Sequence, residues 1–286
     1  MDSQFYIHLP SDSSFGVYPD NTIAKYSTKL SKAIDLDGQY EVGLSEIIYP
    51  TNYFNFDNRE KDYRFWIQIV TKVVNPETRE EELVENVRKR RLVKSGNYKS
   101  LNDFLTIFNR QISEELAEIE LPTNCVKFVR SDEDRVVLVI SSPRDRPILS
   151  RIFFAMSPKL TRRLGYEDDV EPISLNASQR LRAKNSFELN MGKNIMYIYS
   201  DVISHSLVGD VSAPLLRACN LPLLPHDNSI HLTFPDVHYK RVQKAEFDTI
   251  SISINTEEGV PMPFQSGKVL ITLHFRRINN NLLQLR

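Results

Sequence analysis

The sequence predicts a mainly β fold: a single jelly-roll β-sandwich with an α/β insertion between its two halves. Strand-like alternation occurs near both ends of the chain, for example in residues 269–275, where every second residue is a large apolar one. Loops rich in Ser, Gly, Pro, Asp and Asn separate such segments. The middle of the chain has helical spacing instead, which indicates an insertion of a different class.

The first half of the predicted sandwich contains four alternating segments. They cover residues 5–9, 25–30, 40–44 and 65–70, and Pro50 stops the third of them. Each segment places apolar side chains on one face, which is typical of a strand with one face toward a core. We therefore expect the first half of the jelly roll at residues 1–74.

The second half repeats the pattern, and we expect it at residues 191–286. Residues 194–203 are apolar on both faces, as in a covered central strand. The other alternating segments are residues 230–234, 250–254 and 269–275. Eight antiparallel strands in two sheets, with one long connection, fit a jelly roll. In that topology the first and last strands share a sheet.

The insertion is expected at residues 75–190. Residues 100–121 predict an amphipathic helix, with Ser100 as N-cap and Asp103 at the capping-box position. Residues 126–141 predict a hairpin, and Gly165 ends a short helix that starts near Pro158.

Composition restricts the function class. The chain has 286 residues, of which 41% are hydrophobic, and a formal net charge of −1. Proteins that wrap nucleic acid are usually far more basic. The first residues contain no basic segment followed by an apolar run, and no apolar stretch reaches the roughly 20 residues that span a bilayer. We therefore expect a soluble protein made inside the cell, without a membrane span.

The sequence contains none of the common catalytic, phosphate-binding or dinucleotide-binding motifs. Cys219 precedes His226 by seven residues, but nothing around it favours a thiolate nucleophile. The residues His226, Asp227, His231, Asp236 and His238 contain metal-ligand types, yet a solvated strand edge explains them better. We expect no enzyme, no catalytic or metal-binding residues and no cofactor.

A basic run and an apolar loop remain as candidate sites. Arg88, Lys89, Arg90 and Arg91 belong to the sequence VRKRR, which is either a nuclear address or a solvated segment balanced by the acidic residues before it. The loop at residues 201–228 is apolar and rich in proline, so it is either a docking surface or a lid over its own core. The candidate interface residues in it are Val208, Gly209, Asp210, Leu215, Leu216, Arg217, Leu221, Leu223 and Leu224.

Three segments carry a resemblance to a known family. They are NTIAKYSTKLSKAIDLDGQYEVGLSEIIYP at residues 21–50, NIMYIYSDVISHSLVGDVSAPLLR at residues 194–217 and GKVLITLHFRR at residues 267–277. Together with Leu164-Gly165-Tyr166 at the end of the short helix, they resemble the minor capsid, or penton, proteins of Maverick/Polinton elements and adintovirus-like viruses.

The resemblance implies a structural subunit that forms a homopentamer at the vertices of an icosahedral virion. Its implied partners are copies of itself and a major double-jelly-roll capsid protein. It also implies assembly in the host nucleus, which favours the nuclear-address interpretation of VRKRR. It implies no small-molecule substrate and no sequence-specific binding of nucleic acid. The alternative is a carbohydrate-binding jelly-roll module, in which exposed tyrosines and Trp66 would stack on sugars.

Overall fold

The computed structural model of the chain divides it into two compact units. The jelly-roll unit consists of residues 1–53 and 192–286, and the insertion unit of residues 54–191. The residues that the structure describes are 3–57, 61–74, 81–87, 90–141, 150–167, 171–191, 193–221 and 228–278. None of the described helices is both long and apolar enough to cross a membrane.

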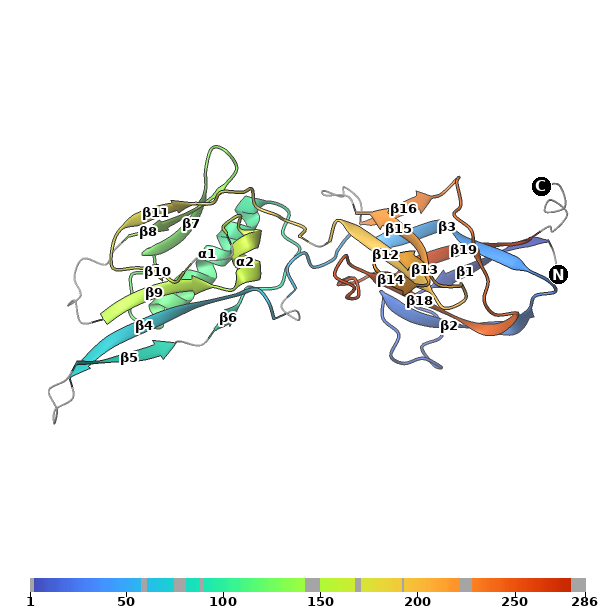
Figure 1. The fold of residues 1–286 in the computed structure, drawn as a ribbon, viewed down its shortest axis with the longest axis horizontal. Helices are drawn as coiled ribbons and strands as arrows, with labels where there is room; N and C mark the ends of the chain where they lie inside the picture. The colour runs from blue at the N-terminus through green and yellow to red at the C-terminus, as the bar shows by residue number, and fades with distance from the viewer. Residues whose placement is uncertain are drawn as a thin grey trace. The chain divides into compact units, whose positions relative to one another are not determined.

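Two sheets, one of five strands and one of four, form the sandwich of the jelly-roll unit (Figure 1). The first sheet has the order β1 (Gln4–Pro10), β19 (Leu270–Arg277), β3 (Tyr40–Pro50) and β16 (Ser229–Thr233), and the short strand β17 (Lys240–Arg241) also pairs with β3. The second has the order β15 (Leu215–Asn220), β12 (Ile195–Ser200), β18 (Glu246–Asn255) and β2 (Lys25–Asp35). Every described pair in both sheets is antiparallel.

The strand order identifies the fold. Counted along the chain, the eight long strands of this unit are β1, β2, β3, β12, β15, β16, β18 and β19. The first, last, third and sixth of them make one sheet, and the second, seventh, fourth and fifth make the other. This is the jelly-roll order, in which two Greek keys wind together. The predicted fold class is therefore confirmed from connectivity.

The first and last strands pair with each other, as predicted. β1 and β19 run antiparallel from Gln4 opposite Arg276 to Pro10 opposite Leu270 (Figure 1). Alternation sets this register, because a slip by one residue would turn the apolar side chains of β19 away from the core. Tyr26 of the second sheet donates a hydrogen bond of 3.0 Å to the carbonyl of Leu9, which links the two layers inside the core.

Two strand assignments differ from the prediction. β4 (Arg64–Val74), expected in the first half of the jelly roll, belongs to the insertion unit, so the chain divides after Tyr53 and not after residue 74. The alternation of β4 is real, but alternation does not tell which sheet a strand joins. The missing jelly-roll strand is β15, which lies inside the segment expected to be a loop. No residue of β15 is β-branched, and Pro214 precedes it, so its sequence lacks the usual strand signals.

The insertion unit contains two sheets and two helices. The larger sheet has the order β10 (Ile173–Ser174), β9 (Ser150–Met156), β4 and β5 (Glu81–Val87), with β6 (Arg91–Leu92) also on β4; the smaller has the order β11 (Gln179–Arg182), β8 (Val136–Ile140) and β7 (Val126–Arg130). The helices are α1 (Leu101–Ala117) and α2 (Pro158–Arg163). The predicted long helix, hairpin and short helix are thus confirmed.

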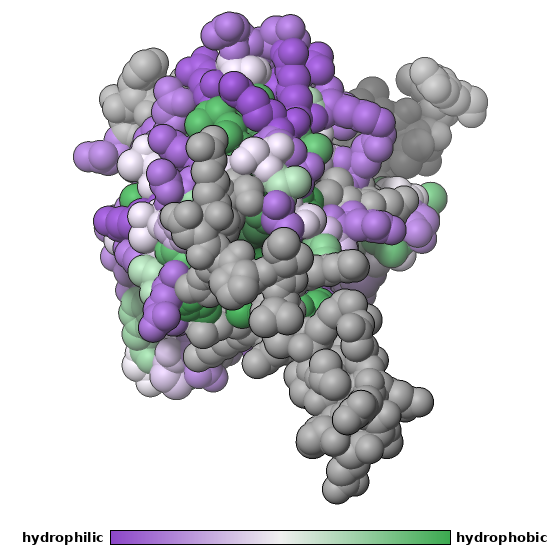
Figure 2. Space-filling model, turned by 90° about the vertical axis from the view of Figure 1, so that its left-hand side faces the viewer, coloured by the Kyte–Doolittle hydropathy of each residue, from purple (hydrophilic) through white to green (hydrophobic). Residues whose placement is uncertain are grey.

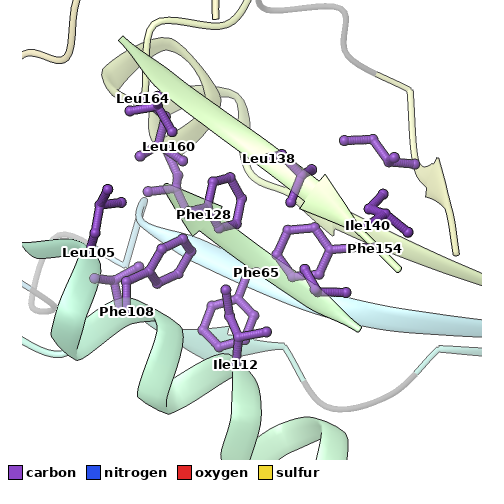
Figure 3. Close-up of a cluster of buried hydrophobic side chains, with 14 of the residues drawn as sticks. Phe65, Leu105, Phe108, Ile112, Phe128, Leu138, Ile140, Phe154, Leu160 and Leu164 are labelled. Carbon is purple, nitrogen blue, oxygen red and sulfur yellow. The ribbon is translucent and has the colours of Figure 1, made fainter. Parts of the chain in front are cut away.

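Aromatic side chains from both sheets and from α1 meet in the core of the insertion unit (Figure 3). Phe65 of β4, Phe108 of α1, Phe128 of β7 and Phe154 of β9 are all fully or almost fully buried and contact one another through their rings. The predicted N-cap of α1 is present, because the Ser100 hydroxyl oxygen accepts a hydrogen bond of 3.1 Å from the Asp103 amide. On the face of the molecule in Figure 2, the described surface is mostly hydrophilic with scattered apolar groups.

Candidate assembly surface

A small hairpin projects from the jelly-roll unit between β12 and β15. It consists of β13 (Ser206–Val208) and β14 (Val211–Ala213), which pair only with each other among the described strands. Gly209 and Asp210 make the two-residue turn, and Gly209 has a φ of 62°. A glycine at the first position of such a turn is the usual solution in tight hairpins, since other residues resist this conformation.

The base of the hairpin is fixed to the sandwich. Val202 and Ile203, which precede it, are buried, and Ile203 forms a bridge with Val242. The amide of Ser200 donates a hydrogen bond of 3.1 Å to the carbonyl of Pro214 on the opposite side of the base. The hairpin is therefore held at its base, and its turn residues Gly209 and Asp210 are exposed.

The hairpin exposes large apolar side chains. Leu207 is 85% exposed and Val211 is 55% exposed, and both lie on strands whose other edges are unpaired among the described residues. Burying one such side chain in a contact contributes roughly 1.5–3 kcal/mol. Leu207 lies opposite Ser212 and Val211 lies opposite Val208, so the two side chains are on opposite faces of the hairpin and each face offers one exposed apolar group for a contact.

A groove lies on the outer face of the second sheet, near the start of β2 and the end of β12. It has a volume of about 590 Å³. The loop at residues 11–24 borders it, with Val17 59% exposed beside it and Phe15 48% exposed nearby. Its wall also includes Tyr18, Tyr199, Pro214 and Lys25. Asn21 ties the loop to β2 through two hydrogen bonds of 2.9 Å with the backbone of Ser27.

The segment at residues 201–228, predicted as one apolar loop, therefore contains both core residues and exposed residues. Leu216 and Leu221 are 2% and 6% exposed and belong to the core of the jelly-roll unit, which corrects their assignment to an interface. Val208 and Leu215 are half-buried, whereas Gly209 and Asp210 are exposed at the turn. Leu223 and Leu224 lie outside the described residues. Leu216 lies in β15 with its side chain in the core, whereas Val208, Gly209 and Asp210 belong to the hairpin.

Arg217 makes contacts within its own unit. Its guanidinium lies 3.9 Å from the ring centre of Phe234, and Nη1 donates a hydrogen bond of 2.9 Å to the carbonyl of Asp236. These contacts attach β15 to the segment that follows β16. The Phe234 ring and the Asp236 carbonyl together orient the Arg217 side chain.

Two residues of the basic run VRKRR, Arg90 and Arg91, make different contacts within the insertion unit. Arg90 stacks over Trp66 at 4.9 Å from the ring centre, and Arg91 donates hydrogen bonds to Glu115 at 2.5 Å and Glu118 at 2.6 Å on α1. The hydrogen bond to Glu115 raises the pKa of Arg91. The charge of Arg91 is therefore balanced by the carboxylates of Glu115 and Glu118. Arg88 and Lys89 lie outside the described residues.

The cysteine and histidine candidates do not form a reactive centre in the part of the chain that is described. Burial raises the pKa of the Cys219 thiol to about 11, which keeps it protonated at neutral pH. His231 lies 3.6 Å from Glu46 and His238 lies 4.0 Å from Asp236, and no cluster of three metal-ligand residues occurs among the described residues. His226 and Asp227 lie outside the described residues.

Phe15 and Val17 are surface residues that the sequence analysis missed. They lie in a loop of Ser, Gly, Pro and Asp, and no alternation distinguishes them. The only signal was an apolar pair in an otherwise polar loop. Their exposure depends on how the loop folds over β2 and β18, which includes a hydrogen bond of 3.0 Å between Tyr18 and Thr249.

Known proteins match this chain only at the level of solved structures. A scan against models of known protein families finds no match, and a search of curated proteins finds none either. The crystal structure of the selenomethionine-labelled mavirus penton protein is similar at 14% identity, over 97% of this chain and 100% of that chain, with a TM-score of 0.49. A chain of the 3.5 Å cryo-EM structure of the Sputnik virophage is similar at 10% identity, over 97% and 98% of the two chains, with a TM-score of 0.44. Because both scores are below 0.5, the fold assignment rests on the strand order described above.

Proposed function

We propose that this chain is a structural minor capsid subunit of the penton type, which assembles as a homopentamer at the vertices of an icosahedral shell. The jelly-roll strand order supports a rigid building block. The segments at residues 21–50, 194–217 and 267–277 support the resemblance to minor capsid proteins of Maverick/Polinton elements and adintovirus-like viruses. We propose no catalytic role and no cofactor for it.

The observation that carries this proposal is the exposed apolar hairpin on its fixed base. A closed ring needs heterologous contacts, in which one surface of a subunit meets a different surface of the next copy. The jelly-roll unit has two such surfaces: the hairpin with Leu207 and Val211, and the groove beside Val17. The proposed contact places the hairpin of one copy in the groove of the next.

Light scattering of the purified protein tests the assembly. The wild-type protein, alone or with a major double-jelly-roll capsid protein, should form particles of five times the mass of one chain. Leu207→Asp should weaken association by at least about tenfold, because a charge replaces an apolar contact group. Its melting temperature should not change, since Leu207 is 85% exposed within one copy. Val260→Asp is the matched control, because Val260 is an exposed apolar residue outside both surfaces.

A mixing experiment tests whether the contact is heterologous. Val17→Asp should damage the groove but leave the hairpin intact, whereas Leu207→Asp does the reverse. Each variant alone should be monomeric, and a mixture of the two should form a one-to-one dimer through the single undamaged pairing. A mixture that stays monomeric, or a wild-type chain that is monomeric in every assembly condition, contradicts the proposal.

We further propose that the subunit enters the host nucleus and becomes part of the virion. Arg88 and Lys89 are the residues to test, because Arg91 is already bonded to α1. Replacing both with Gln should lower the nuclear fraction of a fluorescent fusion while its fold, followed by thermal melting, is unchanged. An equal nuclear fraction for the wild type and this variant would remove the nuclear-address role.

A further inference from the structure

A second cavity lies on the outer face of the first sheet, in the jelly-roll unit. Its volume is about 630 Å³. It is lined by Tyr6 and His8 of β1, Thr272 and His274 of β19, and Ser45 and Glu46 of β3, with the segment at residues 233–239 as a further wall. Hydroxyl, imidazole, carboxylate and aromatic groups therefore line the same space, and none of them belongs to the hairpin or the groove.

One side of the cavity is an aromatic platform. Tyr6 is 58% exposed, and its ring stacks on the imidazole of His274 with centroids 4.4 Å apart and planes 14° apart. The ring of His274 is held from its other side by the Tyr239 hydroxyl, 2.8 Å from Nδ1. Arg276 covers the ring of Tyr239 at 3.5 Å. The stacked pair is thus preorganised, and the outer face of Tyr6 remains open.

His274 also contains a polar atom without a partner. The residue is only 9% exposed, and its Nε2 makes no hydrogen bond to any described residue. A buried polar group in this state normally has an unseen partner. If the Tyr239 hydroxyl donates to Nδ1, Nε2 carries the proton and needs an acceptor; if Nδ1 carries the proton, Nε2 needs a donor. Nε2 itself is inaccessible to solvent, so a ligand in the cavity does not reach it, and the role of His274 at this site is to support the ring of Tyr6.

We propose that this cavity binds a carbohydrate, with an uncharged sugar ring stacked on Tyr6 and a sugar hydroxyl bonded to the Glu46 carboxylate. A sugar ring offers both features, an apolar face for an aromatic platform and hydroxyls that donate to a carboxylate. Glu46, whose side chain is 46% exposed, accepts hydrogen bonds from further hydroxyls and repels acidic sugars. Binding at this site does not require the pentamer.

Saturation-transfer NMR with defined sugars tests the site. The neutral probes are the methyl glycosides of glucose, galactose and mannose together with N-acetylglucosamine, and the acidic probe is N-acetylneuraminic acid. At least one neutral probe should bind the wild-type protein. Tyr6→Leu should lower its affinity about tenfold because the platform is lost, whereas Tyr6→Phe, which keeps the ring, should bind like the wild type.

Two further variants complete the design. Glu46→Gln should also lower affinity, and it changes a partly exposed side chain, so the fold should persist even if Tyr6→Leu unfolds. Phe15→Leu is the matched control, since it removes another exposed aromatic ring from a different loop and should leave binding unchanged. The site is rejected if no neutral probe binds, if binding survives both Tyr6→Leu and Glu46→Gln, or if the acidic probe binds more tightly than every neutral one.

Discussion

Gly43 shows how one missing side chain shapes the outer face of the first sheet. A Cβ at this position would lie 2.8 Å from the carbonyl oxygen of His238 and would also overlap the side chain of Val237. Glycine at residue 43 therefore lets the segment at residues 233–239 pack on β3. That segment carries Tyr239, which orients His274 in the proposed carbohydrate site.

Gly43→Ala should destabilise the jelly-roll unit by roughly 1–3 kcal/mol, because backbone must move to admit the methyl group. Urea unfolding of the wild type and the variant measures the difference. Gly16→Ala is the control, since a methyl group added at residue 16 would have no other atom within 4 Å and the φ of Gly16 is ordinary. Equal stability of the wild-type protein and Gly43→Ala would show that this close packing is absent.

His274 makes stability depend on pH at the same place. Burial, and then the positive charge of Arg276, lower the pKa of His274 below its ordinary value. Because the folded pKa is the lower one, the unfolded chain takes up a proton first as the pH falls. The stabilising effect of the neutral ring is complete above a pH of about 6.5 and decreases as the pH falls from there toward the folded pKa.

We therefore expect the melting temperature of the wild type to fall more between neutral pH and about pH 5 than that of His274→Asn, which cannot titrate. The groups that face the ring are Tyr6, Tyr239 and Arg276. The exposed histidines and carboxylates titrate in both proteins, so they cancel in the comparison. Parallel pH profiles would contradict the assignment to His274.

At the scale of elements, the ion pair between Arg91 and Glu115 connects the short strand β6 to the helix α1. The side chain of Glu115 is only 2% exposed, and Arg91 Nε lies 2.5 Å from it. A buried carboxylate without its partner is costly, so removal of the arginine should matter far more than loss of a surface pair.

Arg91→Met should destabilise the insertion unit by roughly 1–3 kcal/mol, since it leaves Glu115 buried without its cation. The matched control is Arg110→Met, whose partner Glu114 is 3.9 Å away and 67% exposed, and whose loss should cost at most about 0.5 kcal/mol. Denaturant unfolding followed by the signal of Trp66, the one tryptophan, reports on this unit. Similar losses in the two variants would contradict a special role for the buried pair.

At the scale of the whole molecule, the chain forms two cores instead of one. Residues 54–191 surround their own buried cluster of aromatic and aliphatic side chains, and residues 1–53 and 192–286 surround another.

Since a compact unit of this size with its own core normally folds alone, residues 54–191 expressed by themselves should melt cooperatively. Circular dichroism of this fragment during heating measures the thermal transition. Phe108→Ala should lower its melting temperature, because Phe108 is fully buried. A fragment without a cooperative transition would show that the insertion needs the jelly roll.

The sequence by itself determined the fold class and most elements. Alternation located six of the eight jelly-roll strands, an apolar run located β12, and helical spacing with Ser100 and Gly165 located both helices. These signals are local: they depend on which side of a strand or helix faces a core, and neighbouring residues carry that information. Val208, Gly209 and Asp210 were predicted only as part of an apolar, proline-rich loop, and the hairpin that contains them was not predicted.

Only the tertiary structure decided which sheet each strand joins and which apolar residues stay exposed. β4 looks like a jelly-roll strand but pairs with β5, β6 and β9, while β15 has no strand pattern and completes the second sheet. Leu207 and Leu216 are alike in sequence, yet one is 85% exposed and the other 2%. Tyr6 and His274 are 268 residues apart in the chain and stack only because β1 pairs with β19. Such contacts depend on long-range strand pairing, which residues close in sequence do not encode.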